Sequence, residues 1–152
     1  MIVDPMLIMF GKILLAAFLG ALIGTERAVV ARRSAGMRTF ALVTMGAAAF
    51  VIAGTYVDAQ AIGLSNFDPM RIAAAIVMGV GFIGGGVMFA KGDSVHGVTT
   101  AAGLWVTSAI GVIVGFGLYA LAIFATALTL VILFGLWYIE HQFMDWYHGS
   151  DE

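Results

Sequence analysis

The sequence contains no cysteine, only two prolines and few charged residues, which make up 11% of its 152 positions. The absence of cysteine excludes disulfide bonds, thiolate catalysis and cysteine-ligated metal sites. The formal net charge of −2 gives no basis for binding nucleic acid. By contrast, 62% of the residues are hydrophobic, far more than in an ordinary soluble domain. We therefore predict an all-α integral membrane protein, with the lipid bilayer as its surroundings.

Apolar runs close to the roughly 20 residues that a membrane-spanning helix needs recur along the whole chain. Charged or glycine-rich breaks separate five of them, so we expect five transmembrane helices. Their expected bounds are residues 6–24, 39–57, 70–90, 98–114 and 118–139. Residues 1–139 would then form one transmembrane domain. Asp4 and Pro5 stand where a signal peptide would have a basic segment, so we expect the first helix to remain in the mature protein.

The distribution of basic residues predicts the orientation of these helices. Residues 26–38 carry four arginines and one carboxylate, Glu26; the arginines are Arg27, Arg32, Arg33 and Arg38. The positive-inside rule places this segment in the cytoplasm. Residues 58–69 contain Asp58 and Asp68 but no lysine or arginine, as an outside loop should. We therefore expect the N-terminus outside, and both a tight turn at residues 91–93 and the C-terminus in the cytoplasm.

Residues 140–152 form a short amphipathic tail in this scheme, expected to be an interfacial helix in the cytoplasm. Its apolar face, continued from the last span, consists of Ile139, Phe143, Trp146 and Tyr147. His141, Asp145 and His148 follow at i, i+4 and i+7, so they form either a solvated face or a stripe of metal ligands; we assign no metal site. Lys12, inside the first span, either extends its ammonium to the interface or makes a buried polar contact.

The third span is dense in glycine. Gly79, Gly81 and Gly84 match the dinucleotide-binding pattern G-x-G-x-x-G, but no strand precedes them and a phosphate could not reach that depth, so we reject this interpretation. At about 100° per residue, Gly81, Gly84 and Gly85 share one side of the helix, and Gly79 and Gly86 lie almost opposite. Such a helix is either packed closely on both sides or locally unwound around a ligand.

Small-xxx-small pairs occur in other spans as well, which favours close helix packing. They are Gly20/Gly24, Gly81/Gly85 and Gly111/Gly115. The fourth span adds a stripe of Thr100, Gly103, Thr107 and Gly111, whose hydroxyl groups bond either to the preceding turn or to a neighbouring helix.

Two sets of charged residues are candidates for function. Arg71 lies on the side of the membrane where arginine is disfavoured, so it either pairs with Asp68 at the start of the helix or forms an outer mouth together with Asp58. At the other end, Glu26 could pair with Arg27 or with Arg38. These charges serve either to contact a protein or lipid or only to set the topology.

No catalytic arrangement is present. The histidines, at positions 96, 141 and 148, are not in a motif that also supplies a nucleophile, and the sequence has neither H-E-x-x-H nor a P-loop. We expect no enzymatic activity and no cofactor.

The motifs above are similar to the signature of the MgtC/SapB membrane family, in the same order along the chain. The similar positions are Gly20, Gly24, Glu26, Arg27, Gly36-Met37-Arg38-Thr39, Asp68-Pro69, Arg71, Gly79, Gly81-Phe82-Ile83-Gly84-Gly85-Gly86, Gly97-Val98-Thr99-Thr100-Ala101-Ala102 and Trp105. The family has Gly-Ala-Gly at positions 84–86 and leucine at 37 and 98. Many members also continue into a soluble C-terminal domain beyond the length of this chain.

The resemblance implies a multi-pass protein of the bacterial inner membrane, linked to magnesium limitation, acid stress and survival in host cells. In some members it implies inhibition of the proton-translocating ATP synthase. Two hypotheses follow: a regulator that packs against a membrane-protein partner such as the ATP synthase, or a magnesium or proton-coupled cation transporter with its site at the third helix. A shift of 61 residues aligns Gly20 with Gly81, which is either an internal repeat, in support of the second hypothesis, or a chance match in a sequence rich in glycine, alanine and valine. Both are compatible with a homo-oligomer.

Overall fold

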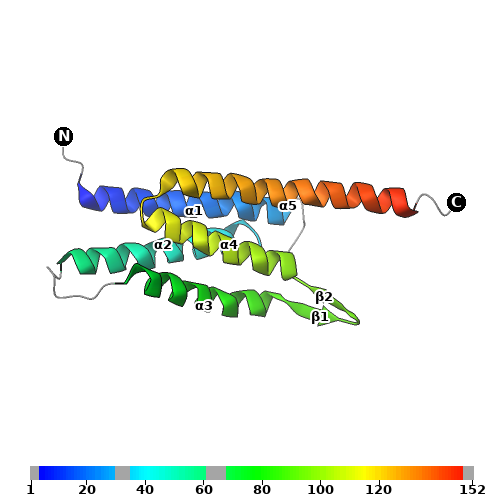
Figure 1. Ribbon diagram of the computed structural model, residues 1–152, viewed down its shortest axis with the longest axis horizontal. Helices are drawn as coiled ribbons and strands as arrows, with labels where there is room; N and C mark the ends of the chain where they lie inside the picture. Colours follow the sequence, from blue (N-terminus) through cyan, green and yellow to red (C-terminus); the bar gives the residue numbers. More distant parts are fainter. Residues whose placement is uncertain (1–3, 30–34, 61–67, 149–152) are drawn as a thin grey trace.

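The computed structural model describes residues 4–29, 35–60 and 68–148, and five helices account for most of them (Figure 1). The helices are α1 (Pro5–Val29), α2 (Met37–Gln60), α3 (Pro69–Val87), α4 (Val98–Gly115) and α5 (Tyr119–His148). Each contains a segment long and apolar enough to cross a membrane. The predicted all-α class and the five spans are therefore confirmed.

The helices are antiparallel along the chain, so their connections gather at two ends. The C-terminal end of α1, the start of α2, the link from α3 to α4 and the C-terminal end of α5 lie at one end, and the N-terminal end of α1 lies at the other (Figure 1). This grouping is the one that the charge pattern requires. Which end faces the cytoplasm remains an expectation, and Arg32 and Arg33 lie outside the described residues.

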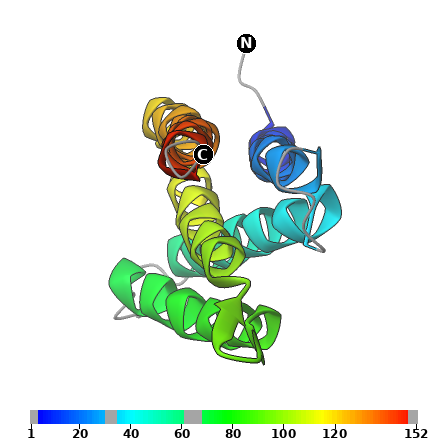
Figure 2. The same cartoon turned by 90° about the vertical axis from the view of Figure 1, so that its right-hand side faces the viewer.

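Helix α4 lies at the centre of the bundle and packs against each of the other four helices (Figure 2). Half of its residues are buried, including the complete predicted stripe of Thr100, Gly103, Thr107 and Gly111. The Thr107 hydroxyl donates a hydrogen bond to its own preceding turn, at the Gly103 carbonyl, 2.7 Å away. Packing is therefore the confirmed role of this stripe.

The third helix ends earlier than expected. Residue Val87 closes α3, and the chain then forms a hairpin of β1 (Phe89–Lys91) and β2 (Ser94–His96), with Phe89 opposite His96. Gly92 has φ +61° at the tip, and the rings of Phe89 and His96 stack with centroids 5.4 Å apart. The expectation of a helix to residue 90 followed by a simple turn is wrong at this point.

Gly97 connects the hairpin to α4 in a conformation that other residues rarely adopt, with φ +88°. A Cβ at this position would lie 3.2 Å from the Met88 Cα, so space is also restricted. At the opposite end of α4, Gly117 has φ +83° and turns the chain directly into α5. These two glycines therefore set where the central helix begins and ends.

Two further boundaries differ from expectation. The first helix does not end at residue 24 as expected, because α1 continues through Glu26 and Arg27 to Val29. At the other end, α5 runs without interruption to His148, so the amphipathic tail continues the fifth helix. The side chains of His141, Asp145 and His148 lie outside the described residues, and so does any metal stripe there.

Candidate functional site

Glu26 and Arg27 form a buried ion pair at the end of α1. Arg27 Nε donates to Glu26 Oε2 over 2.6 Å, and Arg27 Nη2 donates to Glu26 Oε1 over 3.0 Å. Only 7% of Glu26 and 4% of Arg27 are exposed. The two hydrogen bonds join the planar guanidinium to both carboxylate oxygens, which is the strongest geometry available to such a pair. The two opposite charges thus compensate each other inside the bundle.

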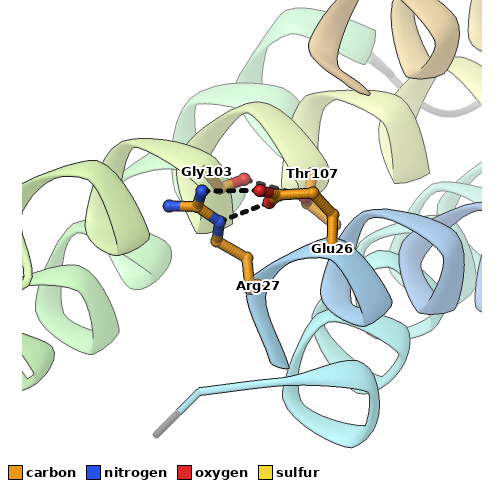
Figure 3. Close-up of polar contacts among 4 residues, drawn as sticks. All are labelled: Glu26, Arg27, Gly103 and Thr107. Carbon is orange, nitrogen blue, oxygen red and sulfur yellow. Dashed lines mark hydrogen bonds and ion pairs between the residues drawn. The ribbon is translucent and has the colours of Figure 1, made fainter. Parts of the chain in front are cut away.

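Helix α4 provides the space for this pair. Figure 3 shows the two side chains extending from α1 toward Gly103 and Thr107 of α4. Gly103 has no side chain, and a Cβ there would already lie 3.2 Å from the Phe40 ring of α2. Thr107 directs its hydroxyl to the Gly103 carbonyl. Phe40 of α2 and Thr107 of α4 thus both lie close to Gly103, next to the ion pair from α1.

This geometry decides between the two predicted partners of Glu26. The partner is Arg27, the next residue along the chain, whereas Arg38 is exposed at the start of α2. Thr39 beside it is half-buried. The idea that Glu26, Arg27 and Arg38 act as one surface patch is therefore wrong, because two of the three are inside the bundle.

The first two helices approach each other closely through glycine. A Cβ on Gly20 would lie 2.6 Å from the Phe40 carbonyl oxygen, and one on Gly24 would lie 2.6 Å from the Met37 Cα. Gly115 of α4 is similarly close to the Val51 side chain of α2, at 2.6 Å. The predicted packing role is confirmed for Gly20/Gly24 and Gly111/Gly115.

The glycines of α3 behave differently. Gly84 packs against Ala101 of α4 at 3.5 Å, but nothing lies within 4 Å of the Cβ position of the other four, which are Gly79, Gly81, Gly85 and Gly86. The helix is continuous through all five. The expectation that both glycine faces are packed is therefore wrong within this chain, and so is local unwinding. The proposed repeat is not reflected in packing either, because Gly20 is tightly packed whereas its counterpart Gly81 is open.

Asp68 and Arg71 are at the start of α3, as predicted for a local ion pair. Asp68 Oδ1 accepts a hydrogen bond from the Met70 backbone N–H over 2.9 Å and so caps the helix. Arg71 Nε lies 3.7 Å from Asp68 Oδ2, with the arginine side chain 86% exposed. Among the described residues, no three of His, Cys, Asp and Glu come together as they would to hold a metal ion.

The remaining predicted positions are at the start of α4, and they do not gather at one site. Thr99 and Trp105 are exposed, whereas Thr100 is buried. Gly103 was predicted only as part of a packing stripe, although it lies next to the ion pair, and Phe40, which lies close to Gly103, was not predicted at all. The only signal in the sequence is that Glu26 and Arg27 directly follow a long apolar run, which gives no information on Phe40 or Gly103.

Lys12, which is half-buried, makes a polar contact between α1 and α4. Its Nζ donates to the Gly115 carbonyl at the C-terminal end of α4, 2.9 Å away. A lysine is favourable there because the last carbonyls of a helix lack partners and carry partial negative charge. Of the two alternatives, the polar contact is confirmed.

We expect Lys12→Met to lower the free energy of unfolding by about 1.5 kcal/mol, since hydrogen bonds from charged groups contribute about that much. Thermal unfolding in detergent measures the change. Lys91→Met is the matched control, because Lys91 is exposed in the hairpin. Equal melting temperatures for the two variants would contradict a stabilising role of the Lys12 contact.

Comparison with known proteins places these features in a family. The model of the MgtC family matches residues 13–142. The chain is 43% identical over 124 residues to the "Putative magnesium transporter YhiD" of Escherichia coli strain K12, covering 80% of this chain and 57% of that protein. It is 43% identical to "Protein MgtC" of Brucella abortus strain 2308 (77% and 46% covered) and 44% identical to "Protein MgtC" of Salmonella typhimurium strain LT2 (78% and 48% covered).

The chain thus spans about half the length of the curated relatives it matches. No solved structure matches it significantly. Together with the five apolar helices, the match identifies a multi-pass membrane protein. The match covers most of the sequence, including the buried ion pair and the glycines of α3, and the chain therefore belongs to the MgtC family.

Proposed function

We propose that this chain is a non-enzymatic regulator in the bacterial inner membrane that acts in magnesium homeostasis and stress adaptation by contacting another membrane protein. The name of the Escherichia coli relative supports the link to magnesium. The family resemblance makes the proton-translocating ATP synthase the candidate partner.

The observation that carries this proposal is an apolar groove between α2 and α3. It has a volume of about 670 Å³. Its walls are Leu42, Val43, Gly46, Ala47 and Phe50 of α2, and Ile72, Ala75, Ile76, Gly79, Val80 and Ile83 of α3. None of these side chains offers the oxygen atoms that would replace the hydration shell of a cation. The groove fits an apolar helix better than an ion path.

Two glycines allow a partner helix to approach the walls of the groove. Nothing lies within 4 Å of the Cβ position of Gly46 or of Gly79. Transmembrane helices associate mainly by close van der Waals packing, which small residues permit. We therefore assign a transmembrane helix of the partner protein to this groove.

Co-purification from native membranes tests the proposal. Gly79→Leu would fill the groove, and we expect recovery of the partner to fall about tenfold, since crowding a packed contact costs about 1–3 kcal/mol. Gly11→Leu is the matched control, because Gly11 is also open but lies on α1 away from the groove. An unchanged set of partners for Gly79→Leu would contradict the proposal.

The same samples test the identity of the partner. If subunits of the ATP synthase are missing from the wild-type sample while other membrane proteins are recovered, the regulatory proposal stands and the candidate partner is wrong. Magnesium or proton flux in proteoliposomes above that of empty vesicles would instead support the second candidate, a transporter, which the name of the Escherichia coli relative suggests.

A further inference from the structure

One face of α3 contacts no other part of the described chain closely, and its residues are regularly spaced along the helix. Ile76, Val80 and Gly84 are buried on the side toward α4. The opposite side carries Arg71, Ala75, Met78, Phe82 and Gly85, which we call the outer seam; of these, Ala75 also borders the groove between α2 and α3. Successive members are four, three, four and three residues apart, the spacing by which two helices keep one face in contact. Figures 1 and 2 show α3 at the edge of the bundle.

The outer seam is strongly exposed. Phe82 is 86% exposed and Met78 is 72% exposed, and nothing lies within 4 Å of the Cβ position of Gly85. Large apolar side chains on a membrane helix can simply face lipid. Arg71, at the end of the same face, is charged, and a charged side chain is unfavourable against lipid chains.

We propose that the outer seam binds the outer seam of a second copy of this chain, with the two α3 helices parallel and a twofold axis along the membrane normal. Both copies have the same topology, so equal residues lie at equal depth. In knobs-into-holes packing at this spacing, Phe82 enters a hole formed by Met78, Gly81, Phe82 and Gly85 of the partner subunit. Two of these four are glycines, so the hole has room for the ring.

Charge complementarity favours a second copy over an unrelated helix. Asp68 and Arg71 lie three residues apart at the start of α3, and their contact within one chain is long, at 3.7 Å, and exposed. Twofold symmetry brings Arg71 of each copy toward Asp68 of the partner subunit. Two reciprocal ion pairs can therefore form at the Arg71 end of the outer seam, and both use only Asp68 and Arg71 of the two copies.

The absence of cysteine makes this inference directly testable by disulfide formation between single-cysteine variants in native membranes. We expect covalent dimers for Ala75→Cys and Met78→Cys. Val77→Cys and Ile83→Cys are controls on the same helix: both residues are partly exposed but point away from the outer seam. Gly135→Cys is an open position on α5. Equal dimer formation at all five positions, or none at Ala75 and Met78, would overturn the proposal.

A charge exchange then distinguishes a second copy from other occupants. A copy with Arg71→Glu is acidic at this end, and a copy with Asp68→Arg is basic. Each alone should form less of the Met78→Cys dimer, by about twofold to fivefold for each lost ion pair. Co-expression of the two should restore it, although neither copy has retained its internal pair.

Asp68→Ser controls for the helix cap, because serine caps a helix without charge. If Asp68→Ser reduces dimer formation as much as Asp68→Arg, the loss of the cap is sufficient and the charge argument is wrong. Failure of the mixed copies to restore the dimer would also overturn it, as expected if lipid or a different helix covered the seam. None of these measurements depends on the regulatory function proposed above, since they report only the proximity of two copies.

Discussion

Replacing Glu26 by glutamine while Arg27 stays in place is expected to lower the free energy of unfolding by about 3–5 kcal/mol. The guanidinium would remain almost fully buried without a counter-ion, because only 4% of Arg27 is exposed. Two charge-assisted hydrogen bonds, of 2.6 Å and 3.0 Å, would be lost or weakened at the same time. Unfolding by a denaturing detergent in mixed micelles measures the change.

Two controls separate burial from charge. Arg71→Met removes an ion pair whose arginine is 86% exposed, so it should cost no more than about 1 kcal/mol. The double variant Glu26→Gln with Arg27→Met removes both buried charges, and it should recover most of the loss, because no buried charge is then left without a counter-ion. A double variant as unstable as Glu26→Gln alone would contradict the explanation by an uncompensated charge.

The five spans could be predicted because their cause is local. A bilayer requires about 20 apolar residues in succession, and each run that met this condition is a helix. The start of α3 was also readable, since Asp68 and Pro69 are residues that begin helices. The hairpin was not, because strands of three residues leave almost no periodic signal and depend on Gly92 and Gly97 at particular positive φ values.

The candidate site could be predicted only in part. Glu26 and Arg27 were recognised as important, but charged residues at the end of an apolar run indicate an interface, whereas here they lie inside the bundle. Their burial depends on space beside Gly103 of α4, more than 70 residues away in the chain. Lys12 was left between two alternatives for the same reason, since its acceptor, Gly115, is 103 residues away.

Glycine shows the same limit most clearly. Composition and helical phase identified the open Gly81 and Gly85 as readily as the tightly packed Gly20 and Gly24. Whether a small residue permits contact depends on the helix that lies opposite, and spacing along one helix does not contain that information. The difference between packed and open glycines therefore depends on the whole bundle. It can be measured on α1 alone, because this helix contains a glycine of each kind.

Gly24→Ala and Gly11→Ala, both on α1, are expected to change stability in opposite directions. A methyl group on Gly24 would lie 2.6 Å from the Met37 Cα and 2.8 Å from the Gly36 carbonyl oxygen. These are backbone atoms, so the two helices would have to separate, at a cost of about 3 kcal/mol. Gly11 has open space, so alanine there should instead stabilise the helix by up to about 1 kcal/mol.

The comparison is internally controlled, because the two substitutions are chemically identical and occur in one helix. Unfolding in mixed micelles at one protein concentration measures both. If the two variants shifted stability by the same amount, the effect would come from intrinsic helix propensity, and the close approach of α1 and α2 would not contribute. Changes of opposite sign in the free energy of unfolding would show that the close approach of Gly24 to the start of α2 matters for stability. This approach sets the distance between α2 and α1, the helix that carries Glu26 and Arg27.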